Sequence, residues 1–310
     1  MRRTLSIIMS ALMLTLLPAC YGAWSKRGVH VDQTDPRLST VADSVIRSEI
    51  IHRSDSASFG EGVIAAFASV MSVYTGQIKV STGIRYDYSL NEYVTDSDLT
   101  SLLAFPSLAL GSTFYLAEAL EAGYNLSDRI PANHEIFYRE PGQRDDFIVL
   151  HEHETASDSI SFVKGYLLSS PYVLKYLRCG ILGHAEDQPR HTQQEWVAFY
   201  NSIPAELAGS APGAICDTIA GLLRRNVLEG TGVQYGKSDV GIAGKTSFGV
   251  AVESGTGESL YETSFVGFMP YDAPLYTMMV TVISSEDAVP RCRSTQVRGI
   301  FIGMLKELGF

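Results

Sequence analysis

The chain is 310 residues long, with 24 Lys and Arg against 34 Asp and Glu, and 45% of its residues are hydrophobic. This length suggests one large domain or two small ones, with enough apolar material for a true core. The net charge of −10 argues against nucleic acid as a partner, because such a partner requires a basic patch that displaces counterions. Four cysteines are too few for a disulfide-stapled scaffold.

The amino terminus has the pattern of a secretion signal. Arg2 and Arg3 precede an apolar run from Leu5 to Leu17, which is shorter than the ~20 residues of a transmembrane helix. The run ends in Leu17-Pro18-Ala19-Cys20, which resembles a bacterial lipobox. This resemblance implies that residues 1–19 are removed and that Cys20 is lipidated; an ordinary cleaved signal or an uncleaved anchor is the alternative.

A lipid anchor would hold the protein in the bacterial cell envelope, periplasmic or on the outer face, and the sequence does not distinguish the inner from the outer membrane. Loss of Arg2 and Arg3 takes the formal charge to −12. The cysteines that remain are an odd number, so at least one stays unpaired. They are Cys179, Cys216 and Cys292, and an oxidising compartment would allow a disulfide between the first two.

Residues 20–36 are expected to form a short polar tether, followed by one folded unit over residues 37–310. Helical spacing of apolar residues predicts a helix over Arg37–Arg53. The β-prone runs Val63–Val73 and Gln77–Thr82 flank a Gly-containing turn and predict a hairpin. Further helices are predicted at Thr113–Ala122, Ser159–Leu168, Tyr172–Cys179, Gln193–Tyr200, Gly213–Leu228 and Ser294–Leu308. Further strands are predicted at Val240–Ala243, Ser264–Met269 and Tyr276–Ser284.

This order of elements predicts an α+β fold. Strands at both ends of the unit, with helices between them, indicate one antiparallel sheet built from N- and C-terminal segments. The two terminal helices should flank this sheet on one face, and the long insert should form a separate helical lobe.

Three short stretches carry residues that could perform chemistry. They are Gly111-Ser112-Thr113-Phe114-Tyr115, Ser169-Ser170-Pro171 and Gly244-Lys245-Thr246-Ser247. In this order they resemble the S-x-x-K, S-x-N and K-T-G signatures of penicillin-binding transpeptidases and serine β-lactamases, in degenerate form. The resemblance includes Val63–Val80, Leu228–Gly232 and Ser264–Pro270, and it runs from about Leu38 to the C-terminus.

The first stretch differs from the family signature at the residue that acts as general base. The resemblance puts Ser112 at the nucleophile position and Tyr115 where the family has lysine. A lysine three residues after the serine lies on the same helical face and can take the hydroxyl proton. A phenol with a pKa of about 10 is a poor base near pH 7. Apart from the resemblance, Ser112 could simply cap a helix.

The second stretch differs from the family signature at the position of the asparagine side-chain amide. Ser169 corresponds to the family serine, but Pro171 replaces the asparagine that orients substrate. The proline side chain offers no donor or acceptor. The alternative is an ordinary helix start, with Ser170 as the N-cap and Pro171 as the first helical residue.

The third stretch keeps the lysine and threonine, Lys245 and Thr246, which in the family meet the carboxylate of the substrate. Ser247 replaces the family glycine, and its side chain could either crowd the substrate or point aside. A solvated lysine on a strand is the alternative interpretation of Lys245.

The resemblance implies a cell-envelope protein that is catalytically impaired and binds a peptidoglycan stem peptide, a β-lactam or an unidentified protein partner. One alternative is an active serine D,D-transpeptidase, carboxypeptidase or β-lactamase-like hydrolase that uses Ser112 in peptidoglycan biosynthesis. Another is a structural envelope lipoprotein with a closed cleft. No cofactor or metal is expected, since Asp239 replaces the first glycine of a P-loop and His151 and His153 provide only two ligands.

Overall fold

The computed structural model describes residues 34–51, 62–131, 159–184, 189–209, 213–253, 259–285 and 290–310. The expected signal at 1–19, the lipidation position Cys20 and nearly all of the expected tether lie outside these residues. Within the described ranges, no helix combines the length and hydrophobicity that crossing a membrane requires.

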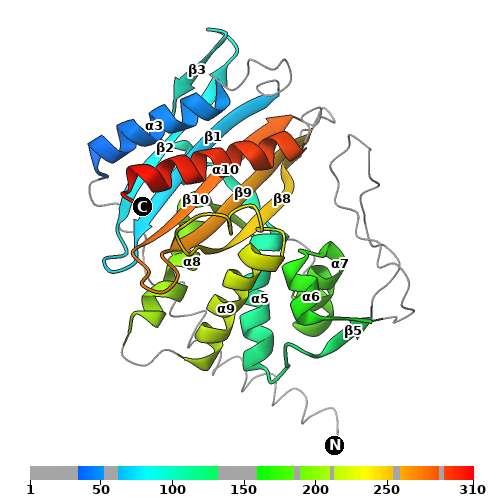
Figure 1. Cartoon of the computed structure of the whole chain (residues 1–310). Helices are drawn as coiled ribbons and strands as arrows, with labels where there is room; N and C mark the ends of the chain where they lie inside the picture. The colour runs from blue at the N-terminus through cyan, green and yellow to red at the C-terminus, as the bar shows by residue number, and fades with distance from the viewer. Residues whose placement is uncertain are drawn as a thin grey trace, which may run out of the picture.

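One six-stranded antiparallel sheet forms the centre of the molecule (Figure 1), in the order β3-β2-β1-β10-β9-β8. Its strands are β1 (Val63–Ser72), β2 (Ile78–Asp87), β3 (Glu92–Thr95), β8 (Ala243–Glu253), β9 (Ser259–Met269) and β10 (Tyr276–Ser285). The central pair, β1 and β10, joins the two ends of the chain. The prediction of an α+β fold with a sheet assembled from distant segments is confirmed.

The two terminal helices, α3 (Pro36–Ile50) and α10 (Pro290–Glu307), cover the same face of this sheet (Figure 1). Ile46 and Ile50 of α3 are buried in one apolar cluster with Phe301 of α10 and the facing strand residues. Asp35 caps α3, since its carboxylate accepts from the backbone N–H of Arg37 at 2.9 Å. The predicted position of both helices on one face is therefore confirmed.

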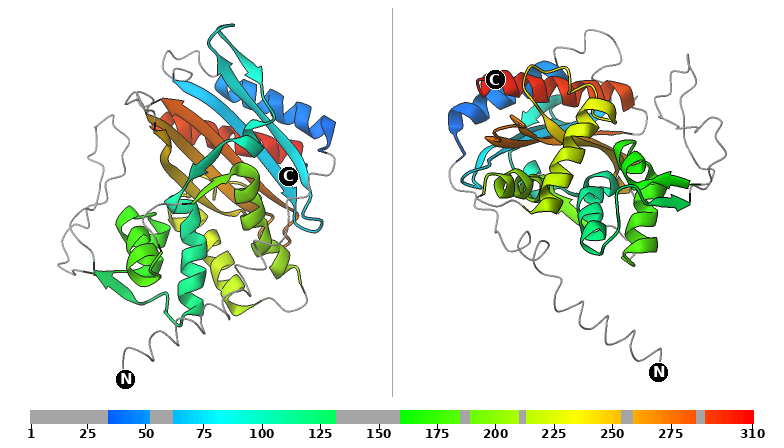
Figure 2. Two further views of the ribbon diagram at one scale, coloured as in Figure 1. Left: turned by 180° about the vertical axis from the view of Figure 1, so that it is seen from behind. Right: turned by 60° about the horizontal axis from the view of Figure 1, so that its bottom comes forward.

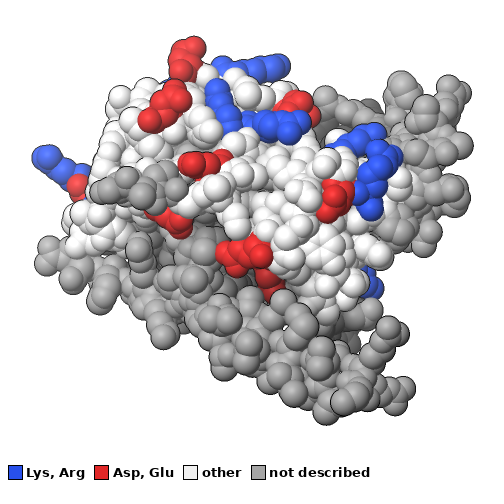
Figure 3. All heavy atoms as spheres, turned by 90° about the horizontal axis from the view of Figure 1, so that it is seen from below, with Lys and Arg blue, Asp and Glu red and all other residues white. Residues whose placement is uncertain are grey.

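The helical insert packs against the other face of the sheet and extends beyond the edge strand β8 (Figure 2). Its helices are α4 (Leu99–Leu102), α5 (Leu108–Glu121), α6 (Phe162–Leu167), α7 (Pro171–Lys175), the π-helix η2 (Tyr176–Ile181), α8 (Gln193–Leu207) and α9 (Ala214–Glu229). Two short strand pairs accompany them, β4 (Ala104–Pro106) with β7 (Arg190–Thr192), and β5 (Arg129–Pro131) with β6 (Ser159–Ser161). On the face seen in Figure 3, the described acidic and basic side chains are interspersed.

Several predicted boundaries differ from the structure. The predicted helix over Ser159–Leu168 is wrong at its start, because Ser159–Ser161 pairs with β5 as strand β6 and α6 begins only at Phe162, capped by Ser161. Helix α5 begins at Leu108 and not at Thr113, because Ser107 caps it and its Oγ accepts from the Leu110 N–H at 3.1 Å. The predicted helix over Tyr172–Cys179 is divided between α7 and the wider turns of η2. Strand β8 begins where the predicted strand Val240–Ala243 ends. The short strands have only three or four residues, too few to show a period-two pattern.

Cys179 and Cys216 are both thiols, so no disulfide joins them. Cys216 is buried in α9, and its thiol donates to the carbonyl of Ile203 in α8 at 3.3 Å. The side chain of Cys292 lies outside the described residues.

A row of buried polar side chains crosses the sheet beneath the start of α5. Glu262 on β9 is fully buried, and its carboxylate accepts hydrogen bonds from Ser247 on β8 and from Ser264, the latter at 2.6 Å. Ser107 and Ser247 share a hydrogen bond of 2.7 Å, as do Ser264 and Thr281 at 2.9 Å. The row therefore joins the cap of α5 to three strands.

Burial raises the pKa of Glu262 to about 7, and the hydrogen bonds from Ser247 and Ser264 oppose this shift. The folded state thus holds a proton that the unfolded chain releases near pH 4.5. The resulting stabilisation is complete below that pH and is lost as the pH rises toward 7.

Glu262→Gln should remove this pH dependence, because the amide keeps the shape but does not titrate. Between pH 4.5 and 7 the wild-type free energy of unfolding should fall relative to that of the variant, by roughly 1–3 kcal/mol. Urea unfolding of both proteins across this range measures the difference. Parallel pH profiles would show that Glu262 does not bind the extra proton.

Candidate active site

Four polar side chains meet where the helical lobe contacts β8, and we call them the Ser169–Lys245 cluster. Ser169 lies between α6 and α7, Thr231 follows α9, and Lys245 and Thr246 are neighbours on β8. The Lys245 Nζ donates to Ser169 Oγ. Ser169 Oγ lies 3.2 Å from Thr231 Oγ1, which accepts from Thr246 Oγ1 at 2.6 Å. The structure thus brings together residues from the second and third sequence stretches.

Ser169 occupies a turn that directs it toward β8. Its φ of +52° is in the left-handed region, which few residues other than glycine adopt. The turn closes through hydrogen bonds from Ser169 N to Tyr166 O at 3.1 Å and from Ser170 N to Gly165 O at 2.9 Å. Beyond it, Ser170 Oγ accepts from the Val173 N–H at 3.4 Å, the pattern of a helix cap before Pro171.

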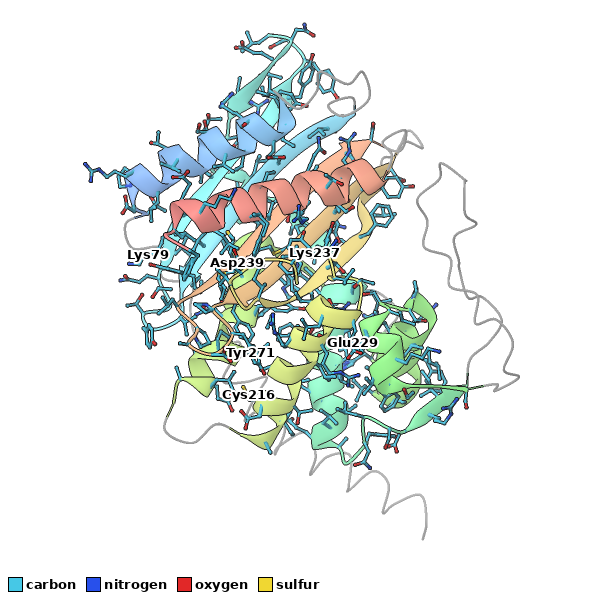
Figure 4. The ribbon with its side chains drawn as sticks, in the orientation of Figure 1. Lys79, Cys216, Glu229, Lys237, Asp239 and Tyr271 are labelled. Carbon is cyan, nitrogen blue, oxygen red and sulfur yellow. The ribbon has the colours of Figure 1, made fainter. Side chains whose placement is uncertain are left out.

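Thr231 is held in place from both sides of its loop. Its N–H donates to the carbonyl of Leu167 at 3.1 Å, and Asn226 Nδ2 donates to the same carbonyl at 3.0 Å. A Cβ on Gly230 would lie 2.7 Å from that carbonyl oxygen, so only glycine allows this approach. Figure 4 labels Glu229 at the end of α9, and Lys237 and Asp239 farther along the segment that leads to β8.

Lys245 is fully buried, and its Nζ lies 5.1 Å from the centroid of the Tyr166 ring. Within the described ranges, no carboxylate forms an ion pair with it. Burial lowers the pKa of the Lys245 amine to about 7, because an unpaired ammonium is costly away from water. A large fraction of the amine is therefore neutral at physiological pH.

Ser112 lies apart from the cluster's hydrogen bonds. It is in the second turn of α5, is fully buried, and donates through Oγ to the carbonyl of Ala109 at 2.6 Å. The first turn contains Leu108, Ala109 and Leu110, and Ala109 is partly exposed there. Leu108 is partly exposed as well, so the accessible side chains of this first turn are a leucine and an alanine.

Tyr115 contacts the π-helix side of the lobe. Its ring centroid is 5.6 Å from that of His184, and the Arg178 guanidinium carbon is 5.7 Å from the ring centroid. The described hydrogen bonds and ring contacts do not link it to Lys245, whose aromatic neighbour is Tyr166.

Ser247 points aside, since its buried side chain bonds Ser107 and Glu262 in the polar row below the cluster. Neither Thr231 nor Glu262 is among the site residues that the sequence predicts. Thr231 stands in the Leu228–Gly232 segment that carries part of the resemblance, so that segment held a signal for it.

No protein-family model and no curated protein matches the sequence. Solved structures do match. Penicillin-binding protein 2B from Streptococcus pneumoniae strain R6 has a TM-score of 0.65 at 12% identity, covering 89% of this chain and 60% of that one. The same protein from strain 5204 has a TM-score of 0.64 at 11% identity, covering 89% and 59%.

The transpeptidase domain of the FtsI4 D,D-transpeptidase from Legionella pneumophila has a TM-score of 0.54 at 13% identity. That match covers 89% of this chain and 99% of the domain, whereas the chain spans about 60% of penicillin-binding protein 2B. At these identities the likeness concerns the fold. The chain has the fold of penicillin-binding protein transpeptidase domains.

Proposed function

We propose that this chain is a cell-envelope protein that binds a peptidoglycan stem peptide or a β-lactam at the Ser169–Lys245 cluster. It does not run the acyl-transfer route that starts at Ser112. The observation that carries the proposal is the contrast between an assembled cluster and a buried Ser112, whose hydroxyl is bonded to the carbonyl of Ala109.

The impairment follows from the position of the helix start. In the family that the sequence resembles, the serine opens its helix and the lysine follows one turn later. Helix α5 begins at Leu108, four residues before Ser112, so Ser112 does not open it. We assign the serine's place to Ala109, which is partly exposed in the first turn, and this puts Ser112, three residues later, in the lysine's place. Neither side chain can do the corresponding work, because alanine has no hydroxyl and a serine hydroxyl is not a base at neutral pH.

The proposed binding role follows from the hydrogen-bond donors of the Ser169–Lys245 cluster. Thr231 and Thr246 are partly exposed residues, and the fully buried Lys245 adjoins Thr246 on β8. A carboxylate would bind to this set through charge-assisted hydrogen bonds. Because its charge stabilises the ammonium form, binding an anion raises the pKa of Lys245 and takes up a proton.

The envelope location rests on residues 1–20 and agrees with the fold. After removal of residues 1–19, a lipid on Cys20 holds the protein at the membrane surface. The anchor keeps the domain near cell-wall peptides.

Binding by the cluster is tested by calorimetry with a stem peptide and with benzylpenicillin. Ser112→Ala should bind as the wild type does, whereas Thr246→Val and Lys245→Met should bind the stem peptide about tenfold or more weakly. Affinity for the peptide should fall as the pH rises above 7, because the amine loses its proton. Penicillin labelling that is stoichiometric and lost in Ser112→Ala would contradict the impairment. Failure to bind either ligand would favour the structural lipoprotein.

The assignment of Ala109 and Ser112 is tested by restoring the family residues. The double variant Ala109→Ser with Ser112→Lys should gain penicillin labelling at residue 109, identified by peptide mass. Tyr115→Lys, the matched control, should gain none, because that position faces His184 and Arg178. Labelling of Tyr115→Lys at Ser112 would show that Ser112 is the nucleophile position after all.

The anchor is tested by Cys20→Ser in the full chain expressed in a bacterium. The wild type should sediment with membranes and carry the added mass of the lipid. The variant should lack that mass and appear in the soluble fraction after lysis. An unmodified wild-type Cys20 would contradict the lipid anchor.

A further inference from the structure

We propose that Ser169 is itself a nucleophile, with the Lys245 amine as its general base, and that it forms an acyl adduct with activated acyl donors such as esters and β-lactams. This inference uses the same cluster as the proposed function and goes beyond it, because binding alone requires no covalent step.

The two groups already have the contact that proton transfer requires. The Lys245 Nζ and Ser169 Oγ are directly hydrogen-bonded, across the junction between the lobe and β8. Ser169 is partly exposed, while Lys245 is fully buried behind it. A reagent that arrives from solvent therefore meets the hydroxyl before it meets the amine.

The neighbouring hydroxyls orient the proton of Ser169. Thr231 Oγ1 accepts from Thr246 Oγ1 at 2.6 Å and from Asn226 Nδ2 at 3.3 Å. Its own proton is then directed to Ser169 Oγ, 3.2 Å away. With one hydrogen bond accepted from Thr231, the Ser169 hydroxyl points its proton at the lone pair of a neutral Lys245 amine.

The surroundings of Lys245 favour that neutral form. The Tyr166 ring from α6 covers it, and among the described residues no ion pair joins it to a carboxylate. The buried carboxyl group of Glu262 on β9 is bonded to Ser247 and Ser264 instead. Burial holds the pKa of Lys245 at about 7, close to the ambient pH at which a general base works best. Enzymes lower the pKa of catalytic lysines to about 7–8 by burial and neighbouring groups, which suits them to act as general bases.

The reaction balances within these groups. Ser169 Oγ attacks the carbonyl carbon of the donor while its proton moves to Lys245 Nζ. A tetrahedral oxyanion forms and collapses, and the bond to the leaving group breaks. With an aryl ester the phenolate departs; with a β-lactam the ring C–N bond opens, and its nitrogen takes the proton from Lys245. An acyl-Ser169 ester remains in either case.

The test is acetylation by 4-nitrophenyl acetate, followed by intact mass and peptide mapping. One acetyl group should map to Ser169, at a rate that rises with pH around a midpoint near 7. Ser169→Gly should lose the adduct; glycine suits the positive φ, so this variant should fold. Lys245→Met should slow the reaction by about 100-fold or more and lose the midpoint. Thermal unfolding checks that both variants are folded.

Two control variants test whether the adduct is specific to Ser169 and whether the pH midpoint belongs to Lys245. Ser170→Ala removes the adjacent hydroxyl and should leave the Ser169 adduct unchanged. Glu262→Gln should keep the midpoint near pH 7, since Glu262 titrates in the same range but lies behind Ser247.

Absence of an adduct, mapping to another residue, or an equal rate in Lys245→Met would overturn the inference. Stem-peptide binding without acetylation would overturn it and leave the proposed function intact. Acetylation at Ser169 without peptide or β-lactam binding would support the inference and contradict the proposed binding function.

Discussion

The structure of the site depends on one contact, the hydrogen bond between the buried amine of Lys245 and the hydroxyl of Ser169. Burying a lysine amine is costly when it is charged, and among the described residues no carboxylate pairs with it. The cost falls if the amine releases its proton, and the pKa of about 7 reflects that balance. The surrounding fold has to hold Lys245 away from water, with Ser169 as its polar partner.

The architecture accomplishes this with segments that are distant in sequence. Strand β8 is the edge of the sheet, so its residues contact the lobe on one side and β9 on the other. The Tyr166 ring covers the amine from α6. The segment after α9 closes the arrangement, since Tyr235 stacks on Phe265 of β9 with ring centroids 3.6 Å apart. Thr231 is thereby held against Ser169.

Much of the fold could be predicted from the sequence. The hairpin around residue 75 and the strands near the C-terminus have strong β-prone patterns, and their pairing into one sheet follows from their arrangement along the chain. The contact between Ser169 and Lys245 also agrees with the resemblance carried by the three short stretches, which places both residues at one site. These features depend on local pattern and on topology, which one sequence carries.

The start of α5 could not be predicted, and the account of the site changes with it. The Gly-Ser-Thr-Phe pattern predicts that a helix starts at Ser112. The real start depends on Ser107, which caps the helix and shares a hydrogen bond with Ser247, a residue 140 positions later. That partner follows from the packing of α5 on β8. The buried Glu262 is equally invisible in sequence, because an acidic residue in a strand is ordinarily solvated.

The central claim is that Lys245 is a buried amine poised between charged and neutral forms beside Ser169. Titration of the lysine side-chain nitrogens by NMR tests it most directly, with Lys245→Met to assign the signal. The account predicts a midpoint near pH 7 for Lys245. A midpoint near 10.5, the ordinary value for lysine, would contradict it, because it would mean that the amine is hydrated and remains charged.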